Sequence, residues 1–186
     1  VFLDFGLNIG IVRYISKYLS SDNEHKLPSF YGMFLIVFIF ISFLILMFGI
    51  LIHQNVDSFY NLTMTIDELY KLKKLILIMF VTMTICFPFN LFLAIITANE
   101  RFTFLKTVMI SRIIINTILL IFFLKMGYGI VFLVSITSFF NFLVVFTNYI
   151  FCRYKLKISI KFNDFDKKNL IKVIKFSFLI FTITIF

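Results

Sequence analysis

The segment that most restricts the possible folds of this chain runs from Phe30 to Ile52, because it contains no charged residue. About 20 mostly apolar residues are enough for a helix to cross the hydrocarbon core of a bilayer. Three other runs have a similar length and character: Leu75–Thr97, Leu105–Leu124 and Ile130–Phe151. Hydrophobic residues make up 61% of the chain and charged residues 15%, whereas a soluble domain is nearer half apolar and a quarter charged. We therefore predict an all-α fold, a polytopic bundle of transmembrane helices.

The N-terminal segment is apolar but carries several polar side chains. It runs from Val1 to Leu19 and contains Asp4, Asn8, Arg13 and Lys17. Asp4 and Asn8 share one helical face, and Arg13 and Lys17 lie roughly opposite. We predict a span with a polar face, in which the two cations anchor the inner edge.

The far end of the chain is an apolar run that stops without a flanking charge, Val173–Phe186. A membrane span normally continues until its backbone reaches the interface. The chain also begins at Val1 rather than at an initiator methionine. We therefore expect residues 1–186 to form a single membrane domain that is an internal part of a larger protein.

The loops between these segments alternate in charge, and Lys and Arg mark the cytoplasmic side of a membrane protein. Thirteen basic residues fall on one side: Arg13, Lys17, Lys26, Arg101, Lys106, Arg153, Lys155, Lys157, Lys161, Lys167, Lys168, Lys172 and Lys175. Four fall on the other side: Lys71, Lys73, Lys74 and Lys125. The loop 153–172 is thus predicted to be cytoplasmic. The net charge of +9 follows from this topology, so we predict no nucleic-acid partner.

Two connections are short, and the first of them predicts an antiparallel hairpin of the helices that it joins. Gly127-Tyr128-Gly129 is a tight outer turn, and Asn99 to Phe102 is an equally short inner turn, whereas Gln54–Lys74 reads as a longer outer loop.

The cytoplasmic loop has a pattern of its own. Apolar and polar residues alternate from Leu156 to Phe162, which is typical of an extended chain. Asp164 or Asp166 is then placed to cap a short basic helix, Lys167–Lys175, on the inner leaflet.

The sequence offers little for catalysis. It contains no paired carboxylates in a span, no nucleophile beside a base and no clustered metal ligands. The two cysteines, Cys86 and Cys152, both occupy apolar positions and suggest neither a disulfide framework nor a metal site. We therefore predict a protein that is not an enzyme and that uses neither a cofactor nor a metal.

Polar residues inside spans are costly and are the first candidates for a site. Arg112 and Asn116 are four residues apart, so they share a helical face. Arg112 lies about six residues inside its span, deep enough to need a partner or a hydrated cavity. Snorkelling of its guanidinium to the interface is the competing interpretation.

Two further polar stripes lie on predicted spans. Cys86, Asn90 and Thr97 form one, on a helix that Pro88 is expected to kink, and Ser138, Asn141 and Asn148 form the other. Such stripes more often hold helices together than bind ligands. Together with Arg112 they predict a partly hydrated interior that contains a cation, which would suit an anionic or sugar-bearing cargo.

The segments LDFGLN and RYISKY (residues 3–8 and 13–18) resemble the second helix of bacterial polysaccharide flippases. These flippases carry O-antigen and capsule repeat units and belong to the multidrug/oligosaccharidyl-lipid/polysaccharide exporter superfamily, whose drug transporters are the MATE proteins. The turn ANERF (98–102), the turn MGYG (126–129) and the basic stretch KNLIKVIKFS (168–177) are also similar to that family in order and spacing.

The resemblance implies a bundle of twelve to fourteen helices, of which this chain holds the second to the sixth and the start of the seventh. It implies a multi-pass protein of the bacterial cytoplasmic membrane that flips undecaprenyl-pyrophosphate-linked oligosaccharide to the outer leaflet. Expected partners are that lipid-linked oligosaccharide, membrane lipids and other polysaccharide-assembly proteins. Arg112 is then the first candidate for the pyrophosphate and Arg13 the second, since a guanidinium binds phosphate oxygens bidentately. Asn116, Asn90 and Asn141 complete the candidate substrate site, and Asp4 is the candidate for ion coupling.

Three alternatives stay open. A MATE-type drug/cation antiporter would need membrane carboxylates, of which Asp4 is the one candidate. A flippase for lipid-linked peptidoglycan precursors would share most of these features. A membrane glycan polymerase or acyltransferase would need catalytic groups in large outer loops.

Overall fold

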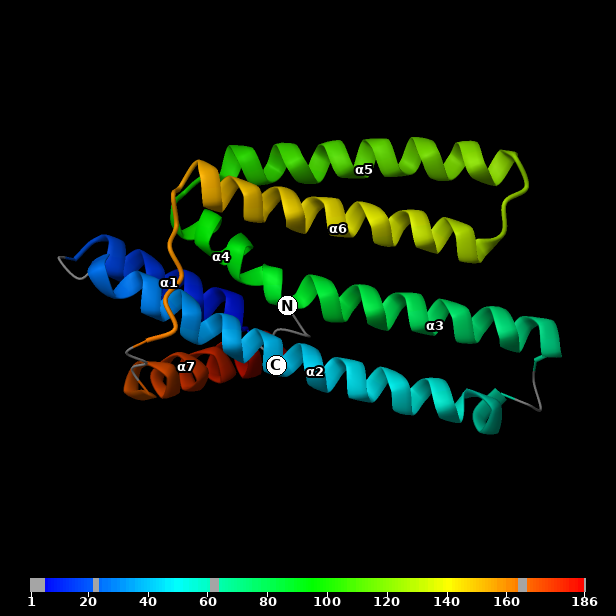
Figure 1. Ribbon diagram of the computed structural model, residues 1–186, viewed down its shortest axis with the longest axis horizontal. Helices are drawn as coiled ribbons and strands as arrows, with labels where there is room; N and C mark the ends of the chain where they lie inside the picture. The colour runs from blue at the N-terminus through cyan, green and yellow to red at the C-terminus, as the bar shows by residue number, and fades with distance from the viewer. Residues whose placement is uncertain (1–5, 22–23, 61–63, 164–166, 186) are drawn as a thin grey trace. The chain divides into compact units, whose positions relative to one another are not determined.

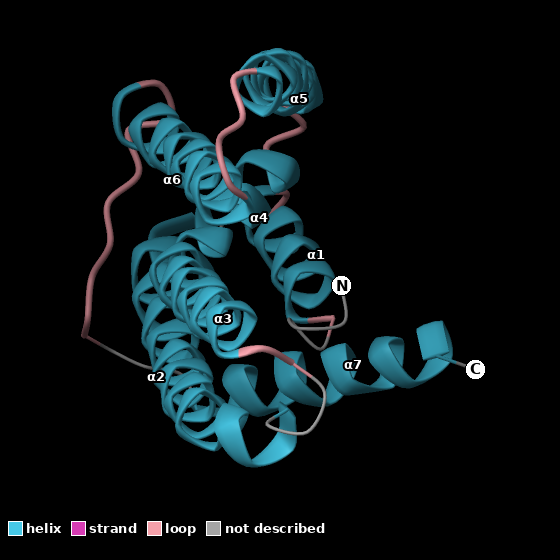
Figure 2. Ribbon diagram, turned by 90° about the vertical axis from the view of Figure 1, so that its right-hand side faces the viewer, coloured by secondary structure: helices cyan, strands magenta, loops and turns pink. Residues whose placement is uncertain are grey.

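The computed structural model describes residues 6–21, 24–60, 64–163 and 167–185, and every regular element among them is a helix (Figure 2). In chain order these are α1 (Leu7–Leu19), the 3₁₀ turn η1 (Glu24–Lys26), α2 (Leu27–Tyr60), α3 (Ile66–Cys86), the 3₁₀ turn η2 (Phe87–Phe89), α4 (Asn90–Ala98), α5 (Phe102–Lys125), α6 (Ile130–Tyr154) and α7 (Lys167–Ile185). The prediction of an all-α fold is confirmed.

Four helical stretches are long and apolar enough to cross a membrane: Glu24–Ser58, Ile66–Ala98, Phe102–Lys125 and Ile130–Tyr154. Each contains one of the four long apolar runs of the sequence. Their surfaces carry large exposed apolar side chains such as Phe40, Phe48 and Ile118, each more than 60% exposed. A soluble protein rarely exposes so much apolar surface, so these helices identify a membrane protein.

The predicted long outer loop between Gln54 and Lys74 is wrong, because most of it is helical. Helix α2 has 34 residues and is about 51 Å long at 1.5 Å per residue, well beyond the ~30 Å hydrocarbon core. Helix α3 begins at Ile66 rather than at Leu75 because a capping box forms there. The Thr65 hydroxyl accepts a hydrogen bond from the Glu68 amide, and the Glu68 carboxylate accepts one from the Thr65 amide.

Pro88 interrupts the second apolar run, as expected. Helix α3 ends at Cys86, η2 spans Phe87–Phe89, and α4 starts at Asn90. Proline has no N–H for an i→i−4 hydrogen bond and its ring crowds the preceding turn.

The chain divides into two compact units, and one of the boundaries between them follows Pro88. Unit 1 is Val1–Phe38, Phe89–Leu105 and Thr147–Phe186, and unit 2 is Ile39–Pro88 and Lys106–Phe146.

In unit 1, α1 packs against both α4 and α7 (Figure 1). The fully buried side chains Ile11 and Ile15 lie on α1, and Leu91 and Ile95 lie on α4. Gly10 permits the contact with α7, because a Cβ at this position would lie 2.3 Å from Ser177 Oγ.

The segment from Leu156 to Phe162 contains no regular element, and the predicted extended conformation is wrong at Lys157, whose φ is +51°. The predicted alternation of its side chains is present over residues 156–160. Leu156, Ile158 and Ile160 are half-buried, and the residues between them are exposed. The Lys161 amide donates a hydrogen bond to the Pro28 carbonyl of α2 at 2.9 Å. A Cβ at Gly32 would lie 2.0 Å from the Lys161 carbonyl oxygen, so the missing side chain lets this segment lie directly on α2.

The short basic helix and the last apolar run form one element, contrary to the prediction of two. Helix α7 is continuous from Lys167 to Ile185. It is not among the four stretches that meet the length and apolarity of a membrane span. Asp164 and Asp166, the predicted caps, lie outside the described residues.

In unit 2, the turn after α5 is a Schellman motif, which reverses the chain into α6 (Figure 1). The Tyr128 amide donates to the Phe123 carbonyl and the Gly127 amide to the Leu124 carbonyl. Gly127 has a φ of +80°, which glycine adopts without steric cost. The rings of Phe123 and Tyr128 pack edge to face across the turn. This geometry agrees with the predicted antiparallel hairpin.

Candidate functional site

A cavity of about 630 Å³ lies in unit 1 beside α1, and we call it the Arg13 cavity. Its lining residues are Arg13, Tyr14, Ser16, Lys17, Ser20, Glu100 and Phe176. Most come from one face of α1, because residues three and four apart on a helix are neighbours. Glu100 follows α4, and Phe176 belongs to α7. The structure therefore turns the predicted inner-edge anchors Arg13 and Lys17 toward a shared space.

Arg13 is held by an aromatic ring. Its guanidinium carbon lies 4.3 Å from the centre of the Phe176 ring, a cation–π contact. Stacking of this kind leaves the edge of the planar guanidinium, with its N–H groups, available for hydrogen bonds. A planar fork of N–H donors matches the oxygens of a phosphate.

Glu100 is the acidic member of the cavity and has an unusual backbone. Its φ is +58°, in the left-handed region that costs a residue with a Cβ roughly 1–2 kcal/mol. The Arg101 amide donates to the Ile96 carbonyl at 3.2 Å, which closes the end of α4 around Glu100. With Arg13 and Lys17 against one carboxylate, the lining carries a net positive charge.

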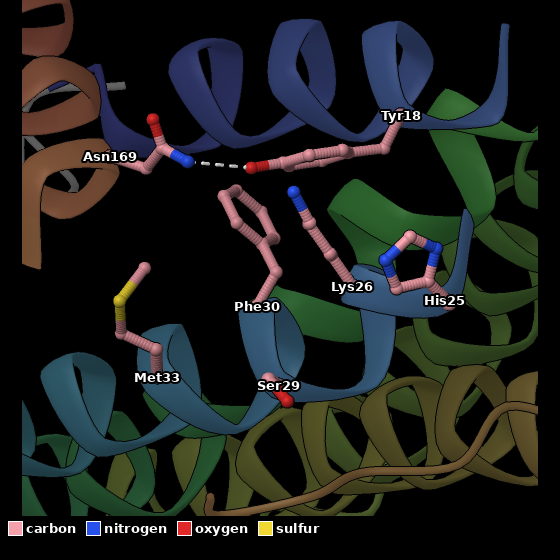
Figure 3. Close-up of a pocket in the computed structure, with 7 residues that line it drawn as sticks. All are labelled: Tyr18, His25, Lys26, Ser29, Phe30, Met33 and Asn169. Carbon is pink, nitrogen blue, oxygen red and sulfur yellow. Dashed lines mark hydrogen bonds between the residues drawn. The ribbon is translucent and has the colours of Figure 1, made fainter. Parts of the chain in front are cut away.

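A second pocket, of about 340 Å³, lies elsewhere in unit 1, and we call it the Lys26 pocket (Figure 3). Its lining residues are Tyr18, His25, Lys26, Ser29, Phe30, Met33 and Asn169. The two pockets have no lining residue in common. From the sequence, Lys26 was predicted only to be one of the cytoplasmic basic residues. No sequence pattern identified Asn169 as a residue of a pocket.

Arg112 and Asn116 lie one turn apart on α5 in unit 2, and both are half-buried. Arg112 Nε and Asn116 Oδ1 are shielded from solvent, and neither finds a hydrogen-bond partner among the described residues. Leaving such groups unpaired in a protein interior is costly. Their spacing places both residues on one face of α5, as predicted.

The remaining predicted site residues are spread over the two units. Asn90 is the half-buried first residue of α4 in unit 1, and Asn141 is half-buried on α6 in unit 2. The stripe of Cys86, Asn90 and Thr97 is divided by η2, since Cys86 ends α3. Asp4 lies outside the described residues.

On α6, one residue of the predicted polar stripe, Asn148, is buried. Asn148 is 4% exposed, and its Oδ1 has no hydrogen-bond partner among the described residues. Nearby, α6 and α4 are joined by the Tyr149 and Phe92 rings, 5.1 Å apart, and by Cys152, whose thiol faces the Phe92 carbonyl. This end of the stripe therefore belongs to a helix-packing contact.

Among the described residues, no group of three or more His, Cys, Asp or Glu side chains could hold a metal ion. Cys86 and Cys152 are both free thiols.

Comparison of the chain with protein-family models, with curated proteins and with solved structures found no match.

Proposed function

We propose that this chain is part of a transporter that moves a lipid-linked oligosaccharide from the cytoplasmic to the outer leaflet of a bacterial cytoplasmic membrane. The cargo would be an oligosaccharide joined through pyrophosphate to undecaprenol. The observation that carries the proposal is the Arg13 cavity, which combines Arg13 and Lys17 in a space of about 630 Å³. Two cations against one acid favour an anionic group, and the volume lies in the usual range of ligand sites.

The distribution of charge supports the direction of transport. Twelve of the 18 basic residues belong to unit 1, and basic residues mark the cytoplasmic side. The Arg13 cavity belongs to this unit and would therefore meet the cargo in the leaflet where lipid-linked oligosaccharides are assembled. In this role the protein carries its cargo without chemical change.

The motifs that resemble polysaccharide flippases support the nature of the cargo. Arg13 and Lys17 belong to the segment RYISKY, and Glu100 belongs to ANERF. Phe176 lies in the basic stretch KNLIKVIKFS. Three of the motifs that carry the resemblance thus contribute side chains to one cavity.

The test is glycan display at the surface of a deletion strain that expresses full-length variants. We expect Arg13→Gln combined with Lys17→Gln to reduce display about tenfold or more, because each lost charged hydrogen bond weakens binding by ~1.5–3 kcal/mol. The matched control is Lys125→Gln, which removes an exposed lysine at the end of α5. Display equal to wild type in the double variant, at an equal protein level in the membrane, would refute the proposal.

A further inference from the structure

The Lys26 pocket is formed by four helical elements, of which α7 is distant in sequence from the other three. Tyr18 comes from α1, His25 and Lys26 from η1, and Asn169 from α7. The remaining lining residues belong to the first two turns of α2: Ser29, Phe30 and Met33. No Asp or Glu is among these described lining residues, so Lys26 gives the pocket a positive charge.

Two walls of the pocket are fixed by direct contacts. The Asn169 amide donates a hydrogen bond to the Tyr18 hydroxyl at 2.8 Å, which joins α7 to α1 (Figure 3). The Phe30 ring meets the Tyr18 ring edge to face at 5.4 Å. The Lys26 side chain extends toward Tyr18 and lies between Phe30 and His25 (Figure 3). The Lys26 ammonium therefore lies beside aromatic and polar side chains that are already held in place by contacts with one another.

The position of the pocket along α2 is where a lipid headgroup would lie. Lys26 belongs to the first turn of the membrane-crossing stretch Glu24–Ser58, and the apolar residues begin at Leu27. Lys26 and His25 are exposed, whereas Phe30 and Met33 are buried. A ligand with a charged headgroup and an apolar tail matches this change from exposed polar residues to buried apolar ones. Basic pockets between helices at the cytoplasmic face bind anionic lipid headgroups.

We propose that the Lys26 pocket binds the phosphate of an anionic membrane lipid, with phosphatidylglycerol as the representative class. Lys26 supplies the charge, and the Ser29 hydroxyl and the His25 ring can hydrogen-bond the phosphate oxygens. A volume of about 340 Å³ accommodates a headgroup rather than a whole oligosaccharide. This site is separate from the Arg13 cavity and does not depend on the identity of the cargo.

The experiment measures dissociation constants of the purified full-length protein in neutral detergent by isothermal titration calorimetry. The probes are short-chain phosphatidylglycerol and phosphatidylcholine of the same chain length. The wild type should bind phosphatidylglycerol more tightly, since the choline group places a cation beside Lys26. Lys26→Gln should weaken phosphatidylglycerol binding about tenfold, the usual size of one charged hydrogen bond, and Ser29→Ala should weaken it less.

The matched control is Lys157→Gln, which removes an exposed lysine of the same unit that does not line the pocket. It should bind like the wild type. Competition by inorganic phosphate would assign recognition to the phosphate itself, and its failure would assign recognition to the whole lipid headgroup. Either result supports the site if Lys26→Gln lowers the affinity. Equal affinity in the wild type and Lys26→Gln, or equal losses in Lys26→Gln and Lys157→Gln, would overturn the proposal.

Discussion

At the scale of single residues, the charged groups inside apolar segments are the most informative. Arg112 has its Nε shielded from solvent with no acceptor among the described residues, and Asn116 Oδ1 one turn away is in the same state. An arginine at the centre of a spanning helix costs about 2.5–3.5 kcal/mol on insertion scales. A position without a role for the charge would tolerate leucine at lower cost.

We therefore predict that Arg112→Ala reduces glycan display about tenfold at a normal protein level in the membrane. Arg112→Lys should restore display only in part, because an ammonium keeps the charge but loses the planar fork of donors. The measurement is surface glycan in the complemented deletion strain, with Lys106→Ala as the control on the same helix. If the side chain only snorkels to the interface, lysine will replace arginine fully and Arg112→Ala will display like the wild type.

The sequence identified some of these residues and missed others for a physical reason. Arg13 and Arg112 could be recognised because a cation within an apolar run carries an energetic cost that is visible in the sequence itself. Phe176 and Asn169 could not, because their roles depend on contacts with α1 that span most of the chain. Glu100 was assigned to a turn, and its place in the Arg13 cavity depends on how α4 ends.

At the scale of elements, the apolar runs predicted the spans but not their ends. Burial in lipid follows from side-chain hydrophobicity, so all four long runs became helices. Helix ends depend instead on local hydrogen bonds and ion pairs. The Thr65–Glu68 capping box starts α3 early, and an ion pair between Lys73 and Asp57 joins α3 to α2.

The segment 156–162 offers a test at this scale, because its contact with α2 depends on a missing side chain. Gly32→Ala would place a Cβ 2.0 Å from the Lys161 carbonyl oxygen. Alanine is the better helix former by about 1 kcal/mol, so α2 itself should stay intact. The hydrogen bond from the Lys161 amide to Pro28 should weaken, and the measurement is hydrogen exchange at that amide, which should become faster by about tenfold or more.

The control for this prediction is Gly129→Ala, since a Cβ there meets nothing within 4 Å. It should leave exchange at Lys161 unchanged. Unchanged exchange in Gly32→Ala would show that the segment is not held on α2 by this close approach.

At the scale of the whole molecule, the basic residues and the two polar cavities are concentrated in one of the two units. Unit 1 holds most of the basic residues, the Arg13 cavity and the Lys26 pocket. The all-α class could be predicted because apolar length and backbone hydrogen bonding leave few solutions in a bilayer. The division into two units could not, because it depends on tertiary contacts along helices that look uniform in sequence.

The most direct test of the central claim is transbilayer movement of a lipid-linked oligosaccharide in proteoliposomes. The full-length protein is reconstituted with an undecaprenyl-pyrophosphate oligosaccharide in the inner leaflet, and its appearance outside is followed with an impermeant lectin. We predict that the wild type transfers the oligosaccharide well above protein-free liposomes, and that Arg13→Gln with Lys17→Gln reduces the rate about tenfold or more. Transfer by the wild type at the rate of protein-free liposomes would contradict the account.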